Sequence, residues 1–230
     1  MNTGGNIFDF NSSSLTDNFS GILALKETLF HLADTNTAAL KTMWLKVGQG
    51  ATVKVGPGQQ VIDGLAFDGG TLVFGDIIPG QTTTENTVHT TGILDISGQG
   101  TVQVTTGATF SNDRPTPDTH IPLLEQDNSN ILVQLVSSDG GVIGNGGNLT
   151  LTDQSSNAIS DAVEADIAQN GAVVAKGTYD YRLTGGDSDD GLYVSYGLTQ
   201  VDLLGKDVDA LILDANGKSG NAADLSARVT

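Results

Sequence analysis

The stretch from Gly171 to Leu204 reads GAVVAKGTYDYRLTGGDSDDGLYVSYGLTQVDLL and holds all four tyrosines of the chain. In its first half Tyr179, Tyr181 and Leu183 alternate with polar residues. This period of two places the apolar side chains on one face of a β-strand. A second run, LYVSY, begins at Leu192 after an acidic segment flanked by glycines. The pattern predicts a β-hairpin.

The register of this hairpin follows from its two apolar runs. A loop from Thr184 to Gly191 would form three cross-strand pairs: Leu183 with Leu192, Tyr181 with Val194, and Tyr179 with Tyr196. All three pairs would lie on one face, as cross-strand packing requires, and a slip of one residue would separate them. Our hypothesis is a hairpin that closes one side or end of a larger β structure. The alternative is an ordinary hairpin in any β-rich domain.

Composition indicates many short strands and turns. The chain has 230 residues, of which 38% are hydrophobic and only 5% aromatic, so its core consists of small and aliphatic side chains. Thirty glycines and only five prolines, with abundant Thr, Asn, Asp and Ser, favour one large β domain or two small ones.

The formal net charge is −17, and cysteine is absent. Such a surface repels the phosphates of nucleic acids and anionic lipids, so we expect no nucleic-acid partner and no membrane insertion. A cysteine-free chain rich in Gly, Asn, Asp and Thr is typical of bacterial secreted or surface proteins. The first residues contain no signal peptide, and no run approaches about 18 apolar residues. If the protein is exported, we expect this chain to be an internal fragment.

Short apolar runs predict strands over most of the chain. The first pair lies within Ile22–Leu32, where His31 is expected to face solvent, and a polar link with one helical turn at Ala38–Lys41 follows. Trp44, the only tryptophan, is expected in the core. The other predicted strands are Trp44–Val47, Thr52–Val55, Val61–Phe67, Thr71–Phe74, Ile93–Ser97, Thr101–Thr105, Ile131–Val136, Asn148–Thr152, Val208–Leu213 and Ala223–Val229.

An internal repeat suggests a coiled arrangement. Two segments share the pattern strand–GQG–strand: WLKVGQGATVKVG, which begins at Trp44, and ILDISGQGTVQVT, which begins at Ile93. The first glycines of their turns are 50 residues apart. Each long unit has room for two turns of a coil. Between the strands we expect loops at Ile77–Thr91 and around the proline cluster Asp113–Pro122. The segment Asn157–Asn170 has helical apolar spacing and is read as a short helix or a poor strand.

Several motifs resemble sites of chemistry. Gly186-Asp187-Ser188 resembles the start of a serine-protease nucleophile motif, but Asp189 replaces the glycine that frees the oxyanion hole. Asp187, Asp189 and Asp190 are a weak candidate for a Ca²⁺ site, since the twelfth position of an EF-hand loop would be Leu198 instead of glutamate. The three histidines are far apart in sequence, so zinc has no support. We expect no catalytic residues, no enzyme activity and no cofactor apart from this weak Ca²⁺ candidate.

Two architectures fit many short strands with Gly/Asn/Asp turns. A β-sandwich should show alternating strands and a turn signal every eight to twelve residues. The spacing here is irregular, with loops inserted between matching strand units. We therefore predict an all-β chain folded as a right-handed parallel β-helix, with inserted loops and a closing C-terminal hairpin. Its expected organisation is coils over 1–110, a loop-rich insertion and further coils over 111–170, and the hairpin with terminal coils over 171–230.

The chain also resembles a known family. Four segments look like the C-terminal part of autotransporter passenger domains of Gram-negative bacteria, of the pertactin and self-associating adhesin type. They are LAFDGGTLVF at 65–74, ILDISGQGTVQV at 93–104, GTYDYRL at 177–183 and DDGLYVSYGLTQVDL at 189–203. The resemblance covers roughly residues 20–230, and the tyrosine hairpin is its most specific part.

The resemblance implies a β-helical passenger exported through the periplasm and the outer membrane by a C-terminal β-barrel, with an adhesive or virulence role at the cell surface. Its partners would be that barrel and molecules of host or neighbouring cells. In the family, the segment nearest the barrel often acts as an autochaperone that folds first. Carried onto this chain, the hydrophobic closure and folding nucleus would be Tyr179, Tyr181, Leu183, Leu192, Val194 and Tyr196.

Two other functions stay open at the level of sequence. A β-helical polysaccharide-degrading enzyme would need acidic residues clustered with Lys or Arg, and only ten basic residues exist. A phage or fibre structural protein would be expected to form a trimer. Turnover of polysaccharides would support the first, and a trimer in solution the second.

Overall fold

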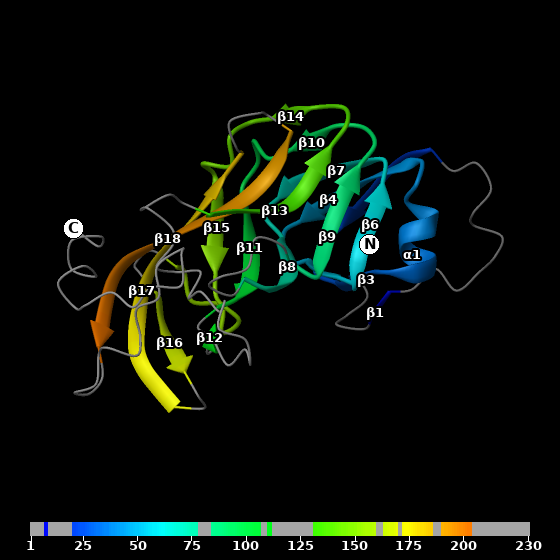
Figure 1. The fold of residues 1–230 in the computed structure, drawn as a ribbon. Coiled ribbons are helices and arrows are strands. Elements are labelled where there is room, and N and C mark those ends of the chain that lie inside the picture. Colours follow the sequence, from blue (N-terminus) through cyan, green and yellow to red (C-terminus); the bar gives the residue numbers. More distant parts are fainter. Residues whose placement is uncertain are drawn as a thin grey trace.

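The computed structural model describes residues 7–8, 20–77, 84–106, 110–111, 131–159, 163–169, 172–185 and 190–203. This part of the chain is nearly all β, with three sheets and a single short helix (Figure 1). The predictions that fall on 204–230, among them the strands Val208–Leu213 and Ala223–Val229, lie outside the described residues. Most of the predicted insertion around Asp113–Pro122 also lies outside them.

The three sheets, which we name A, B and C, draw their strands from the whole described chain. Sheet A contains β1 (Ile7–Phe8), β3 (Leu29–Leu32), β5 (Thr52–Val55), β8 (Thr71–Asp76), β11 (Gly100–Thr105) and β15 (Leu149–Thr152). Sheet B contains β2 (Gly21–Leu25), β4 (Met43–Gly48), β7 (Gly64–Asp68), β10 (Leu94–Asp95) and β14 (Val142–Ile143). Sheet C contains β6 (Gly58–Ile62), β9 (Asn86–Thr90), β12 (Phe110–Ser111), β13 (Ile131–Ser138), β16 (Val163–Gln169), β17 (Ala172–Thr184) and β18 (Gly191–Leu203).

The chain passes through these sheets in a recurring order. The strands β4, β5 and β6 lie in sheets B, A and C, and the next three strands, β7 to β9, follow the same order. We call one such passage a level. All neighbouring strands in sheets A and B are parallel, as are β6, β9 and β13 in sheet C. The prediction of an all-β chain with parallel strand pairing is confirmed.

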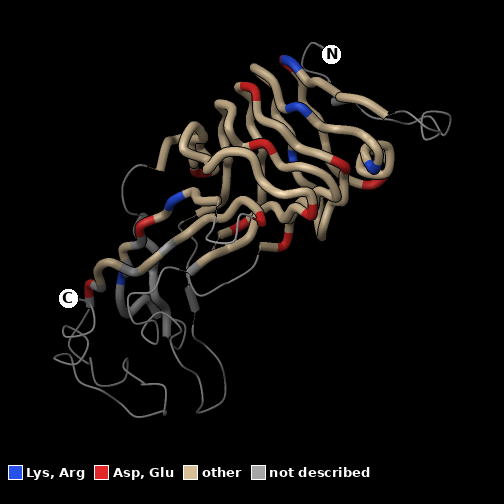
Figure 2. The backbone as a smooth tube through the Cα atoms, turned by 90° about the horizontal axis from the view of Figure 1, so that it is seen from above, with Lys and Arg blue, Asp and Glu red and all other residues tan. Residues whose placement is uncertain are grey.

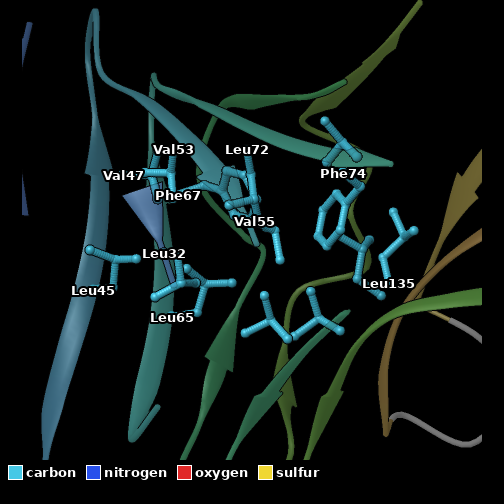
Figure 3. Packing of buried hydrophobic residues seen from close by; sticks show 14 of the residues in the cluster. Leu32, Leu45, Val47, Val53, Val55, Leu65, Phe67, Leu72, Phe74 and Leu135 are labelled. Atoms are coloured by element: carbon cyan, nitrogen blue, oxygen red, sulfur yellow. The ribbon is translucent and has the colours of Figure 1, made fainter. Parts of the chain in front are cut away.

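The strand register aligns similar residues in successive levels. In sheet B, Leu45 pairs with Leu65 and Leu65 with Leu94, all fully buried. The interior side chains of sheets A and B meet in one core, where Val47 and Phe67 lie beside Val53 and Leu72 (Figure 3). The two copies of the predicted repeat therefore lie two levels apart, as their 50-residue spacing suggested.

The short helix α1 (Asp34–Ala39) occupies the place of a sheet C strand after β2 and β3. Leu40, at its end, is fully buried, and its carbonyl oxygen accepts a hydrogen bond of 3.0 Å from the Asp63 N–H. The Thr37 hydroxyl bonds to the side-chain oxygen of Gln60 in β6. Helix α1 therefore lies against the first strand of sheet C. It begins four residues before the predicted helical turn.

Three of the predicted elements are corrected. The predicted loop Ile77–Thr91 contains β9, because Val88 and Thr90 lie beside Gln60 and Ile62 of β6 and are fully buried there. The predicted strand Val61–Phe67 is divided at Asp63 between sheets C and B. In Asn157–Asn170 the helical reading is wrong and the strand reading holds, since β16 pairs with β17 along its whole length.

Trp44 is the fourth correction. The burial of β4 alternates, with Met43, Leu45 and Val47 inside, so Trp44 and Lys46 face outward. Trp44 is partly exposed on the outer face of sheet B and is absent from the described core. His31, in contrast, is exposed as predicted.

Candidate functional site

The tyrosine hairpin is confirmed as β17 and β18, but its predicted register is wrong by two residues. Leu183 pairs with Val194, Tyr181 with Tyr196, and Tyr179 with Leu198; the predicted partners were Leu192, Val194 and Tyr196. Because the shift is two residues, the same side chains still share one face. A bulge between Thr178 and Tyr179 changes the register further along.

The hairpin also pairs with a third strand, and the local pattern does not reveal this pairing. β18 also pairs antiparallel with β13, where Val194 lies opposite Val133 and Leu192 opposite Val136. Residues 191 and 192 are therefore held by β13 and not by β17. The hairpin extends sheet C with antiparallel pairs at one end of the parallel stack (Figure 1).

Four of the six predicted closure residues join the core. Leu192 and Val194 are fully buried, Tyr181 is 4% exposed, and Leu183 is partly buried against the same cluster. The side chains of Tyr179 and Tyr196 lie outside what the structure describes. The hairpin thus adds apolar side chains to the core that sheets A and B begin.

Two contacts tie the hairpin to distant levels. The Tyr181 hydroxyl donates a buried hydrogen bond of 3.2 Å to the carbonyl oxygen of Ile77, which follows β8 and lies 104 residues earlier. Leu192 reaches the turn after β14: a Cβ at Gly146 would lie 3.6 Å from its Cδ1 and 3.7 Å from the Cδ1 of Ile96. The hairpin therefore contacts three successive levels rather than its neighbour alone.

The acidic loop of the hairpin is described only at its end. Asp187 and Asp189, with the rest of the Gly186-Asp187-Ser188 motif, lie outside the described residues. The Asp190 carboxylate accepts a hydrogen bond of 2.6 Å from the Tyr193 hydroxyl, which in turn accepts one of 2.7 Å from the Gln134 amide. Among the described residues no three His, Asp or Glu side chains gather as metal ligands. The Ca²⁺ candidate stays a prediction.

Sequence reasoning missed a histidine cluster on the outer face of sheet C. The ring of His89 in β9 contacts the Ser137 hydroxyl at 2.9 Å through Nδ1 and an Asp139 carboxylate oxygen at 3.2 Å through Nε2. About fifty residues separate His89 from both partners, so no local motif signals it. Because Ser137 lies in β13 and Asp139 directly follows that strand, the cluster links β9 to β13.

A second polar cluster closes the loop after β15. The Asp153 carboxylate accepts hydrogen bonds from the Asn157 N–H at 2.8 Å, the Asn157 side-chain amide at 3.1 Å and the Ser155 N–H at 2.9 Å. The bonds from Asn157 and then Ser155 favour the charged form and hold the pKa of Asp153 below its usual range.

Two curated relatives are similar to this chain over its whole length. The uncharacterized protein YuaQ of Escherichia coli K12 is 47% identical over 231 residues, and the uncharacterized lipoprotein YdeK of the same strain is 35% identical over 247 residues. The alignments cover only 17% and 18% of these proteins, so the chain spans less than a fifth of the curated relatives it matches. No family model and no solved structure matches the chain.

Helix α1 has six residues, and the described part of the chain contains no helix with the length and apolar character needed to cross a membrane.

Proposed function

We propose that this chain is the barrel-proximal part of an autotransporter passenger in a Gram-negative bacterium, and that β17 and β18 act as its autochaperone. The parent protein would be a non-enzymatic surface or secreted adhesin, exported through the periplasm by its own C-terminal β-barrel and contacting molecules of host or neighbouring cells. The observation that carries the proposal is the hairpin built onto the end of a parallel stack.

The finer fold in this proposal is a right-handed parallel β-helix. Its support is the repeated order of sheets B, A and C and the parallel register that stacks Leu45, Leu65 and Leu94. In a solenoid each coil contacts its neighbours, so adding a coil to an existing pair costs little while the first pair is costly. A segment that supplies the first stable pair would therefore control folding of the whole passenger.

The hairpin has properties that suit such a nucleus. Its two strands are adjacent in sequence, so their pairing closes only a short loop. It is long, with thirteen residues in each strand, and it offers buried Tyr181, Leu192 and Val194 as a surface for the preceding level. One relative, YdeK, is named a lipoprotein, which supports a cell-envelope location for the proposed parent protein.

The first experiment introduces charge into the closure. Tyr181→Asp and Val194→Asp place a carboxylate at buried positions, where an unpaired charge is strongly destabilising. We expect both variants to abolish refolding of this chain from denaturant and surface display of the full-length protein. Leu132→Asp is the matched control, because Leu132 in β13 is 43% exposed.

A second experiment separates a folding nucleus from a merely stabilising contact. Val194→Ala in the hairpin and Val53→Ala in β5 remove the same atoms from positions that are both fully buried. For a nucleus, Val194→Ala slows refolding, whereas Val53→Ala mainly speeds unfolding. Stopped-flow refolding measures both rates. Unchanged display of the Asp variants, or a refolding rate that only Val53→Ala reduces, would refute the proposal.

A further inference from the structure

The outer face of sheet B carries a shallow hollow centred on Lys46. The strand register places Ala24 of β2 and Ala66 of β7 on either side of Lys46. Gly48, two residues after Lys46 on β4, pairs with Asp68 of β7. These neighbours are small, so they leave space around the Lys46 side chain. The hollow has a volume of about 270 Å³ and is lined by Ala24, Leu25, Lys26, Lys46, Gly48, Gln49 and Asp68.

The polar wall of this hollow offers hydrogen-bond donors beside acceptors. The Lys46 ammonium lies 2.9 Å from an Asp68 carboxylate oxygen, with the two side chains 41% and 62% exposed. Gln49, at the turn after β4, adds an amide that both donates and accepts. The group of residues is thus arranged for a ligand with several hydroxyls.

Beside the hollow, beyond Lys46 on the same face of sheet B, the surface is apolar. Trp44 precedes Lys46 by two residues on the same face of β4, about 7 Å away along the strand. Its indole lies over Gly64, where an added Cβ would approach the ring to 2.6 Å. Ile22, which is 62% exposed, is its partner in β2. A partly exposed aromatic ring held against glycine is a firm surface for a ring-shaped ligand.

We propose that this hollow binds one sugar residue of a neutral glycan. The hydroxyls of a pyranose suit the Lys46–Asp68 pair and Gln49 in the hollow, and its apolar C–H face suits Trp44 beside the hollow. The volume lies just below the roughly 300–1,000 Å³ of drug-sized ligand sites, which fits a single sugar ring. The net charge of −17 disfavours long polyanions. The site gives a ligand class to the adhesive role proposed above and rests on that role for its biological meaning.

Trp44 is the only tryptophan of the chain and lies beside the hollow, so its fluorescence reports on a ligand that reaches from the hollow to its ring. We would titrate the whole chain with maltohexaose, cellohexaose and chitohexaose, and with oligogalacturonate as an anionic probe, at low and high salt. Lys46→Met and Asp68→Asn remove one polar partner each. Lys54→Met is the matched control, since Lys54 is exposed on β5 in sheet A. Amide NMR shifts provide a second readout and show that each variant is folded.

The expected result is saturable quenching by at least one neutral oligosaccharide, insensitive to salt. Lys46→Met and Asp68→Asn should weaken binding about tenfold or more, with Lys54→Met unchanged. Three outcomes would overturn the proposal: no binding of any neutral oligosaccharide, binding of oligogalacturonate alone with loss at high salt, or equal weakening by Lys54→Met. None of them would alter the refolding test of the hairpin, so the two proposals fail separately.

Discussion

Gly191 lies where β18 comes closest to β13. A Cβ added there would collide with the Val136 carbonyl oxygen, and Gly191 pairs with Ser137 in the same ladder. The acidic, glycine-flanked loop therefore contains one glycine that is required by a tertiary approach and not by the turn itself.

Gly191→Ala should separate the two strands and destabilise the chain by about 1–3 kcal/mol. The control is Gly75→Ala in β8, where the nearest atoms would lie at an ordinary 3.5 Å. Urea unfolding of the two variants measures the difference. Equal stabilities would show that β18 does not depend on this close approach.

Tyr181 combines a buried ring with a hydrogen bond from its hydroxyl to the Ile77 carbonyl oxygen. Tyr181→Phe keeps the ring and removes the bond, so we expect a loss of about 0.5–1.5 kcal/mol in the free energy of unfolding. Tyr193→Phe, which loses partly exposed bonds to Gln134 and Asp190, should cost less because water replaces them. A larger loss in Tyr193→Phe would contradict this ranking.

The lowered pKa of Asp153 predicts that the stability of the chain depends on pH. The hydrogen bonds from Asn157 lower the pKa of Asp153 in the folded chain below the ordinary value of 3.8. The contribution of Asp153 to stability is therefore fully present above the pKa of the unfolded chain and is lost as the pH falls through the pKa of the folded chain. Carbon NMR titration of the carboxyl should give a value below 3.8 in the wild type. Asn157→Ala should raise it towards the ordinary value. A wild-type titration at or above that value would rule out the effect.

At the scale of elements, the two ends of sheet C are treated differently. At one end α1 lies against β6, with Leu40 buried and Thr37 bonded to Gln60. Beyond β13 the sheet continues with the antiparallel strands β18, β17 and β16, and β12 lies at its other end. Each arrangement gives partners to a strand that would otherwise expose an unpaired edge.

Leu40→Ala tests the helical end. Removing this fully buried side chain should cost about 2–5 kcal/mol and weaken the contact between α1 and β6. Hydrogen exchange should then accelerate in β6 before it does in β18. Lys41→Ala, the next residue and exposed, is the control. Uniform acceleration across all strands would mean that α1 does not act locally.

At the scale of the whole molecule, three sheets share one core while the surface is strongly acidic. Asp and Glu are distributed along the described tube, and Lys and Arg are few (Figure 2). A net charge of −17 opposes the compact state by self-repulsion.

Salt should therefore stabilise the chain. Raising the ionic strength from about 0.01 to 0.15 M shortens the Debye length from roughly 30 to 8 Å, and we expect the melting temperature to rise by a few degrees. Circular dichroism at both salt concentrations measures it. The rise should disappear at a pH low enough to neutralise most carboxylates. A melting temperature that falls with salt would show that local ion pairs, such as Lys46–Asp68, outweigh the overall repulsion.

Much of the fold could be predicted because its signals are local. Alternating apolar residues in TVKV and TLVF define β5 and β8, and the glycine turns between strands are visible in the sequence. The two copies of the GQG repeat indicated stacking two levels apart. The same locality explains the misses: β9 has only Val88 as a strong apolar signal, and Asp63 divides a run that looks continuous.

The sequence by itself determined the all-β class, the hairpin and the inward position of four of its side chains, because side-chain alternation has a period of two and depends on neighbours alone. These four are Tyr181, Leu183, Leu192 and Val194. The outward position of Trp44 follows from the same alternation within β4. Only the tertiary structure decided the hairpin's register and the pairing of His89 with Ser137 and Asp139. Each of these depends on a strand from another level, and contacts between residues about fifty positions apart are fixed by stacking, which no local pattern encodes.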